Sequence, residues 1–311
     1  MPSSCACVSV VYTPVDGYTN MKKIFLLAAL FILALWYASQ WSVTVGTDTM
    51  EPDACRQSPS ETEDTLLSVT SRGDGETPSE RIAYEIPNIG KQLPEILIHH
   101  YSYTISYNPE LCIPNWVAWE LDATKLVERE SRNKHFLPDP NLSEDMAVTT
   151  DEYRNSGWDR GHMCPAGDNK YHWRAMDACF YMTNICPQNS NLNRGDWKEL
   201  EDACRVWAAR EPVYIVCGPV MYKRPKYGFI GRRFRIRIPD AFFKVVLTGM
   251  HSGHPRAIGF LFKNEAGNRR LDKYVNTVDE LERITSIDFF PALPDEIEDS
   301  IESQYDMDKW Q

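Results

Sequence analysis

The chain has 311 residues, of which 43% are hydrophobic and 12% aromatic, and a formal net charge of −11. This apolar content excludes a wholly disordered chain, and the length suits one domain of roughly 200 residues with flanking segments. The charge is unevenly distributed: nine acidic residues lie in 48–80 and eight in 288–308, whereas seven basic and no acidic residues lie in 222–237. A basic centre between acidic flanks can still meet a phosphate backbone.

An apolar run lies near the N-terminus, directly after two lysines. Lys22 and Lys23 precede the hydrophobic residues 24–38. This run is short for a membrane-spanning helix, which needs about 20 residues, and it matches the core of a signal peptide. We expect residues 1–41 to carry a cleaved signal peptide or an uncleaved signal anchor, with a buried helix as the alternative. The folded part of the chain would then be extracytoplasmic: periplasmic, secreted or membrane-anchored.

The next segment, 42–94, is rich in Ser, Thr, Asp, Glu, Gly and Pro and lacks apolar periodicity. We interpret it as a flexible acidic linker. The folded domain is expected over 95–294, and a mobile acidic tail over 295–311.

Six of the nine cysteines fall inside the folded domain. Export would favour one or more disulfides among them, and small buried thiols are the alternative. These residues are Cys112, Cys164, Cys179, Cys186, Cys204 and Cys217.

Strand-like stretches and a few helices alternate irregularly along the domain. The predicted strands are 97–107, 116–121, 180–185, 213–217, 232–238, 241–247 and 257–262, and the predicted helices begin at Asp196 and at Val278. The first helix shows apolar residues spaced for one buried face, and Asn193 and Asp196 resemble a capping pair at its start. This order predicts an α+β fold with a mainly antiparallel sheet and packed helices.

Two short segments carry the groups that phosphodiester hydrolysis needs. The first is Asp159-Arg160-Gly161-His162, and the second contains Asn193 at the start of the first predicted helix. A neutral imidazole can accept a proton from water, a guanidinium can bind a phosphate, and an amide oxygen can ligate a hard cation. The pattern therefore predicts a metal-dependent nuclease.

These motifs resemble those of the DNA/RNA non-specific endonuclease family, the ββα-metal nucleases that include mitochondrial endonuclease G. The resemblance covers about residues 95–294 and rests on three motifs in order: DRGH at 159–162, NICPQ at 184–188 and LNRGDW at 192–197. It implies the ββα-metal finger nuclease fold and dependence on Mg²⁺, with Mn²⁺ able to substitute. It also implies that both DNA and RNA are bound and cleaved with little sequence preference.

The resemblance implies roles for three residues in particular. His162 is expected to be the general base, with a structural histidine as the alternative. Asn193 is expected to be the metal ligand, with a helix cap as the alternative. Glu201 lies about 12 Å further along a continuous helix, so we expect it to hold metal-bound waters rather than the ion, unless it is only a solvated surface residue.

Supporting residues are expected around these three. Arg160 would orient its loop or bind the scissile phosphate, unless it only pairs with Asp159. Arg132 is a candidate for a second phosphate-binding arginine, in a loop that matches the family poorly. Asn184 is a candidate for hydrogen bonds that support the site, with a core role as the alternative.

A further surface is expected on the predicted strand 232–238. Arg233, Arg235 and Arg237 alternate with apolar residues there and would share its exposed face. Such a face could bind a phosphate backbone without reading sequence, or could simply be solvated.

A sugar-non-specific endonuclease is the leading hypothesis for function. A catalytically silent, nucleic-acid-binding module of nuclease-like fold and a phosphodiesterase for small nucleotides are the alternatives. The presence of both His162 and Asn193 favours the enzyme. The sequence leaves open a homodimer and membrane association through the N-terminal segment.

Overall fold

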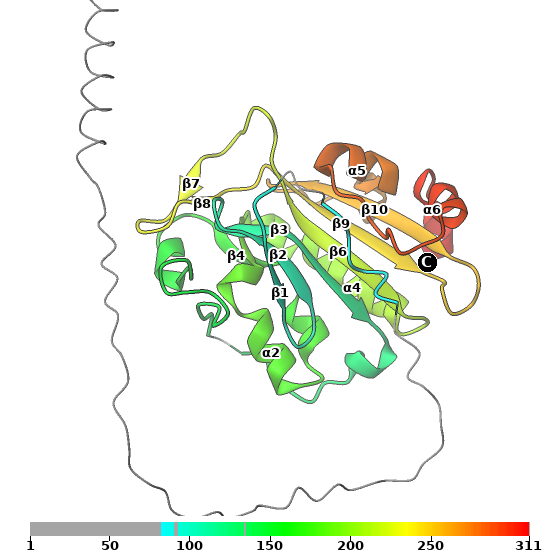
Figure 1. Cartoon of the computed structure of the whole chain (residues 1–311), viewed down its shortest axis with the longest axis horizontal. Coiled ribbons are helices and arrows are strands. Elements are labelled where there is room, and N and C mark those ends of the chain that lie inside the picture. The colour runs from blue at the N-terminus through cyan, green and yellow to red at the C-terminus, as the bar shows by residue number, and fades with distance from the viewer. Residues whose placement is uncertain (1–81, 90–92, 134, 311) are drawn as a thin grey trace, which may run out of the picture. The chain divides into compact units, whose positions relative to one another are not determined.

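The computed structural model describes residues 82–89, 93–133 and 135–310. A seven-stranded sheet lies at its centre in the order β1-β2-β3-β6-β9-β10-β11, and all neighbouring strands are antiparallel (Figure 1). The strands are β1 (Ile96–His99), β2 (Thr104–Asn108), β3 (Ile113–Leu121), β6 (Val213–Val220), β9 (Ala241–Thr248), β10 (Arg256–Lys263) and β11 (Val275–Asn276). The predicted α+β class with a mainly antiparallel sheet is confirmed.

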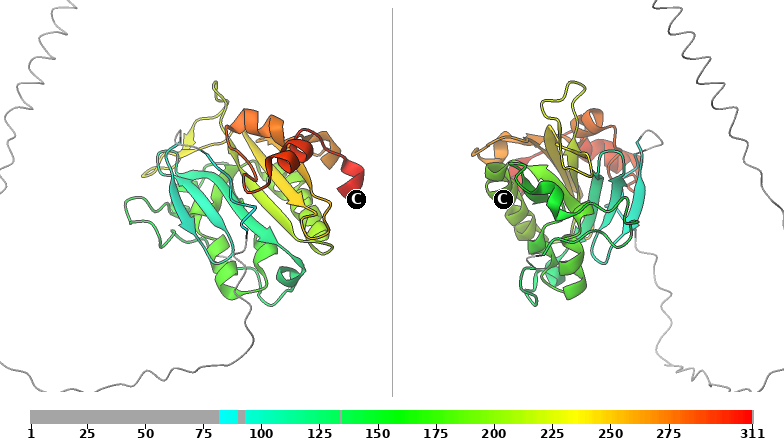
Figure 2. Two further views of the ribbon diagram at one scale, coloured as in Figure 1. Left: turned by 45° about the vertical axis from the view of Figure 1, so that its right-hand side comes forward. Right: turned by 90° about the vertical axis from the view of Figure 1, so that its left-hand side faces the viewer.

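Helices cover both faces of this sheet. Side chains alternate along β6, so that Ile215 packs into one hydrophobic core and Val216 into another. Helix α4 (Asp196–Ala208) covers the first face, and α5 (Val278–Thr285) covers the second. Figure 2 shows the orange α5 and the light green α4 on opposite sides of the sheet.

A second, two-stranded sheet carries the DRGH motif. The motif itself is strand β4 (Asp159–His162), which pairs antiparallel with β5 (Ile185–Gln188). Helices α3 (Ser190–Arg194) and α4 follow directly, so two strands and a helix form the predicted ββα arrangement. The motif needs glycine at position 161, because a Cβ there would lie 2.1 Å from Oε1 of the buried Gln188.

The remaining elements of the described residues are short. They are α2 (Trp173–Cys179), α6 (Asp295–Glu302), the strand pair β7 (Phe229–Ile230) and β8 (Ile236–Arg237), and six 3₁₀ turns at Ala123–Leu126, Thr150–Tyr153, Ala166–Asn169, Met182–Asn184, Leu271–Lys273 and Met307–Trp310.

The folded part extends beyond the predicted 95–294 at both ends. Ile89 is buried, and Asn88 exchanges two backbone hydrogen bonds with Asp288 at 2.8 and 2.9 Å. At the other end Trp310 is only 3% exposed and packs edge-on against Trp207, with 4.7 Å between ring centroids. The prediction of a mobile tail over 295–311 is therefore wrong for residues 295–310.

Three predicted strands differ from the observed elements. The single strand 97–107 is a hairpin, because the chain turns between β1 and β2. Residues 182–184 of the predicted strand 180–185 form a 3₁₀ turn before β5 begins. The predicted strand 232–238 is reduced to the two residues of β8.

The expected basic face of that strand is wrong for Arg237. Its side chain is buried, donates hydrogen bonds to the carbonyl oxygens of Tyr227 and Gly228, and forms an ion pair with Asp240 at 3.0 Å. Alternation predicted an outward direction, but the buried carboxylate three residues later supplies an inward partner. Arg233 and Arg235 are exposed, and their guanidinium groups lie over the rings of Phe234 and Phe229.

Two expectations concern the cysteines and the N-terminal segment. All six cysteines of the described domain are buried free thiols, so the expected disulfides are not found there. No helix among the described residues is both long and apolar enough to cross a membrane. The apolar run 24–38 and the linker up to residue 81 lie outside the described residues.

Candidate active site

A cleft of about 1160 Å³ opens beside β4 and the start of α4. Five residues predicted from the sequence line it together: Arg132, Arg160, His162, Asn193 and Glu201. The predicted support residue Asn184 does not line the cleft, and neither do Arg233 and Arg235.

The cleft is locally basic although the whole chain is acidic. Seven basic side chains line it, against five acidic ones. The basic residues are Arg132, Arg154, Arg160, Lys170, Arg194, Lys198 and Arg205, and the acidic ones are Glu128, Asp151, Asp159, Glu201 and Asp202. A concave surface with this balance attracts polyanions more strongly than the net charge implies.

His162 ends β4 and lies between two aromatic rings. Its ring centroid is 5.2 Å from that of Phe136 and 4.8 Å from that of Phe180, and the residue is only 7% exposed. Burial, with the positive charges of Arg132 and Arg160, lowers the pKa of His162 to about 3. The imidazole is therefore neutral at physiological pH, and its Nε2 atom is enclosed without a hydrogen-bond partner.

The two predicted phosphate-binding arginines contact the faces of the same two rings. The guanidinium of Arg160 lies 4.5 Å from the centroid of Phe136, and that of Arg132 lies 5.6 Å from the centroid of Phe180. Aromatic faces hold guanidinium groups without using their N–H donors. Arg160 does not pair with Asp159, whose carboxylate is taken by Arg194 at 3.1 Å.

Asn193 lies inside α3, and its amide is oriented by the DRGH motif. Its Nδ2 atom donates to Oδ2 of Asp159 at 3.1 Å, which leaves Oδ1 as the group that can ligate a cation. It caps neither helix, since the side chain of Asn189 caps α3 and no side chain caps α4. The predicted capping pair is therefore wrong, and no helix cap uses the side-chain oxygen of Asn193.

A break at Gly195 separates α3 from α4. A Cβ at this position would lie 2.7 Å from the carbonyl oxygen of Asn191, so the turn requires glycine. The spacing of about 12 Å calculated for a continuous helix therefore does not apply here. The break allows Asn193 and Glu201 to line one cleft.

Glu201 belongs to a charged stripe on α4, formed with Lys198, Asp202 and Arg205, that was not predicted from the sequence. These four residues lie on one face of α4 at helical spacing, beside the apolar face. Burial raises the pKa of Glu201 to about 7, opposed by the nearby Lys244. Its protonation state therefore changes close to neutral pH.

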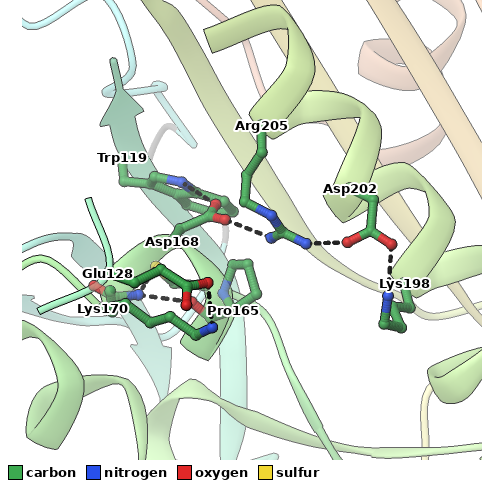
Figure 3. Close-up of polar contacts among 10 residues, drawn as sticks. Trp119, Glu128, Pro165, Asp168, Lys170, Lys198, Asp202 and Arg205 are labelled. Atoms are coloured by element: carbon green, nitrogen blue, oxygen red, sulfur yellow. Dashed lines mark hydrogen bonds and ion pairs between the residues drawn. The ribbon is translucent and has the colours of Figure 1, made fainter. Parts of the chain in front are cut away.

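Ion pairs tie this stripe to the wall of the cleft (Figure 3). Arg205 donates to Oδ1 of Asp168 at 2.8 Å, and the indole of Trp119 donates to Oδ2 of the same carboxylate at 3.1 Å. Asp202 joins Arg205 to Lys198. These contacts fix the face of α4 that presents Glu201.

Asn184 is hydrogen-bonded to backbone groups next to the site. Its Oδ1 atom accepts a hydrogen bond from the backbone N–H of Cys164 at 2.9 Å, and its Nδ2 atom donates to the carbonyl oxygens of Cys164 and Cys179. The side chain is fully buried. It joins the segment after His162 to the end of α2.

The segment after β10 anchors both helices of the site. The backbone N–H of Asn189, the cap of α3, donates to Oδ1 of Asn264 at 2.8 Å. Asp196, the first residue of α4, accepts hydrogen bonds from the backbone N–H of Asn268 and from the hydroxyl of Tyr274. Residues 264–274 therefore hold the starts of α3 and α4.

The family model described as DNA/RNA non-specific endonuclease matches residues 84–296. The chain belongs to the DNA/RNA non-specific endonuclease family. It is 36% identical over 225 residues to the mitochondrial nuclease EXOG of Xenopus laevis, a match that covers 68% of this chain and 61% of that protein. It is 34% identical over 217 residues to a nuclease of Nostoc, covering 66% and 76% of the two chains.

A solved structure has the same fold as this chain. The EndoG chain of an EndoG/EndoGI complex superposes with a TM-score of 0.61 at 24% identity, covering 67% of this chain and 91% of that one. Nucleases of this family generally depend on a divalent metal ion. The amide oxygen of Asn193 is a hard oxygen donor of the kind that such an ion prefers, and the carboxylate of Glu201 can accept hydrogen bonds from waters bound to the ion.

Proposed function

We propose that this domain is a metal-dependent, sugar-non-specific endonuclease that hydrolyses phosphodiester bonds of DNA and RNA. The observation that carries the proposal is the surroundings of His162. This neutral histidine lies between two aromatic rings, and an arginine guanidinium lies over each ring. The same basic cleft contains the side-chain amide of Asn193, which Asp159 orients. Mg²⁺ or Mn²⁺ held by Asn193 would neutralise charge at the phosphate and at the leaving oxygen.

Arg132 and Arg160 would bind the substrate phosphate. Their guanidinium groups rest on aromatic faces, so their N–H donors remain available for two parallel bonds to phosphate oxygens. Contacts of this kind recognise the nucleic-acid backbone rather than the bases. They are consistent with cleavage of DNA and RNA without sequence preference.

His162 would accept the proton of the attacking water. Nε2 is enclosed, so Nδ1 is the nitrogen that can receive a proton from the cleft. A pKa of about 3 makes a weak base, but two positive charges contribute to that value. A phosphate bound by Arg132 and Arg160 would offset these charges, raise the pKa of His162 and strengthen the base when substrate is present.

Glu201 would hold waters next to the cation once it is ionised. Its pKa of about 7 means that this function is gained as the pH rises through neutrality. The ion pairs of Arg205 and Asp202 keep its helix face in position.

Digestion of plasmid DNA and of RNA tests the proposal directly. We expect cleavage of both with Mg²⁺, none with EDTA, and a loss of about 100-fold or more in His162→Ala. His251→Ala, which removes an exposed histidine in a turn outside the cleft, is the matched control. Intact substrates with wild-type protein and Mg²⁺ or Mn²⁺ would refute the enzyme, leaving a silent binding module; cleavage of bis(p-nitrophenyl) phosphate alone would indicate a small-nucleotide phosphodiesterase.

The extracytoplasmic location is proposed from the sequence of residues 22–38 alone. Fractionation of cells that express the full chain tests it. Recovery of the protein only with cytoplasmic markers would contradict this location.

A further inference from the structure

A second, smaller hollow adjoins the active-site cleft. Its volume is about 320 Å³, and Arg132 lines both hollows. Trp173, the first residue of α2, also lines it and is 55% exposed. More than half of the surface of Trp173 is therefore in contact with water, next to an arginine to which we assign phosphate binding.

Trp173 is the end of a row of nearly parallel rings. The ring of His172 lies 5.8 Å from it with an interplanar angle of 24°, and the ring of Tyr101 lies 4.5 Å from His172 with an angle of 22°. Tyr101 comes from the turn between β1 and β2 and is 52% exposed. Two segments distant in sequence therefore build one aromatic surface.

This row is held in place before any ligand arrives. Nδ1 of His172 accepts a hydrogen bond from the backbone N–H of Arg174 at 3.1 Å, which fixes the central ring. The guanidinium of Arg174 lies 5.3 Å from the indole centroid of Trp173 and adds positive charge. Two carboxylates, those of Glu130 and Asp177, also line the hollow, and that of Asp177 accepts a hydrogen bond from Asn133 at 3.0 Å.

We propose that Tyr101, His172 and Trp173 form a stacking platform for unpaired bases of a single-stranded nucleic acid whose backbone passes Arg132 into the cleft. The platform rests on the proposed function and adds a preference to it. Every base has a π-face, so stacking tolerates any sequence, whereas paired bases of a duplex cannot leave their stack to use it. Arg132 and Arg174 supply the positive charge that the backbone of such a strand needs.

The binding test uses a fluorescein-labelled oligothymidylate of 12 nucleotides and anisotropy, with the full chain carrying His162→Ala and Mg²⁺ present. Loss of one stacked base costs about 1–3 kcal/mol, so we expect Trp173→Ala to weaken binding roughly 5- to 150-fold. Trp173→Phe, which keeps a π-face, should retain most of the affinity. Tyr305→Ala removes a similarly exposed aromatic residue that lines neither hollow, and it should change nothing.

The same variants with a labelled 12-base-pair duplex separate stacking from other effects. We expect the affinity for duplex to be unchanged in Trp173→Ala. Equal losses for single strand and duplex would overturn the platform, and so would an unchanged affinity for oligothymidylate in both Trp173→Ala and Tyr101→Ala. Failure of the His162→Ala protein to bind oligothymidylate at all would overturn it as well.

Hydrolysis of bis(p-nitrophenyl) phosphate distinguishes this proposal from the proposed function. This substrate is too short to reach the platform from the cleft, so Trp173→Ala should keep its kcat/KM while raising KM for single-stranded DNA. If wild type hydrolyses neither substrate but Trp173 still determines single-strand affinity, the enzyme proposal fails and the platform stands. If both substrates are hydrolysed with the same KM in Trp173→Ala and wild type, the platform fails and the enzyme stands.

Discussion

The side-chain amide of Asn193 donates a hydrogen bond to the carboxylate of Asp159, with 3.1 Å between Nδ2 and Oδ2. Asp159 is itself held by two bonds from the guanidinium of Arg194, at 3.1 and 3.2 Å. The first residue of the DRGH motif therefore decides which atom of Asn193 is presented to a cation. Without it the amide could rotate and present its N–H₂ group.

Asp159→Ala should accordingly weaken metal binding rather than remove the base. Loss of an orienting partner typically costs 10- to 100-fold in metal affinity, so we expect a rise of that order in the Mg²⁺ concentration for half-maximal activity. Mg²⁺ titration of plasmid cleavage measures it. Asp151→Ala, which removes another carboxylate that lines the cleft but pairs with the exposed Arg154, should leave the titration unchanged.

The pKa of His162 should lie far below its ordinary value in the free protein and rise when phosphate binds. The folded value of about 3 lies below the unfolded value of about 6.5, so the unfolded chain binds more protons between these limits. Protonation of His162 therefore favours the unfolded chain, so the free energy of unfolding of the domain decreases as the pH falls from about 6.5 towards 3. NMR titration of the imidazole, with and without inorganic phosphate, checks both statements; a midpoint near 6.5 in the free protein would contradict them.

Glu201 should determine how metal dependence varies with pH. Its carboxyl is protonated below about pH 7 and ionised above it. We expect the Mg²⁺ concentration for half-maximal activity to fall as the pH rises from 6 to 8 in wild type, and to vary less in Glu201→Gln. If both proteins show the same pH dependence, Glu201 does not act on the metal-bound waters.

Arg237→Ala should destabilise the domain without a specific effect on nucleic-acid binding. Removing one partner of a buried ion pair typically costs about 3–5 kcal/mol, and Asp240 would be left buried. For a domain of this size each kcal/mol lowers Tm by about 2–4 °C, so calorimetry should show a decrease of several degrees or more. Arg235→Ala, at an exposed position two residues away, is the control and should change Tm by less than about 2 °C.

Glu302→Gln should stabilise the domain at alkaline pH. Carboxylate oxygens of Asp279, Glu282 and Glu302 lie within 4.8 Å of one another, and burial with the charge of Glu282 raises the pKa of Glu302 to about 9. The folded state binds this proton more tightly than the unfolded state, so stability falls as the pH rises from about 4.5 to 9. Thermal melts at pH 5 and pH 8 should show a smaller decrease in the variant than in wild type. Exposed Glu296→Gln should melt like wild type at both pH values.

Local sequence patterns predicted the helices and strands that form the site better than they predicted which side chains contact each other. The apolar spacing of Trp197, Leu200 and Cys204 predicted α4 because a helix buries one face regardless of what covers it. The DRGH residues form one strand, β4, but the sequence did not show that Asp159 faces Asn193, 34 positions away. The burial of Arg237 and Trp310 was missed because it depends on Asp240 and on Trp207, which lies 103 positions from Trp310.

The anchoring of α3 and α4 by residues 264–274 has a consequence for local unfolding. Asn264 holds the cap of α3, and the backbone around Asn268 holds the first residue of α4. If this segment opened, both helix starts would lose their partners at once, so the amides of the two helix starts and of the segment should form one cooperative unit. Native-state hydrogen exchange should report a single opening free energy for all three. Any ligand that contacts only residues 264–274 would then slow exchange in the part of the cleft that contains Asn193 as well.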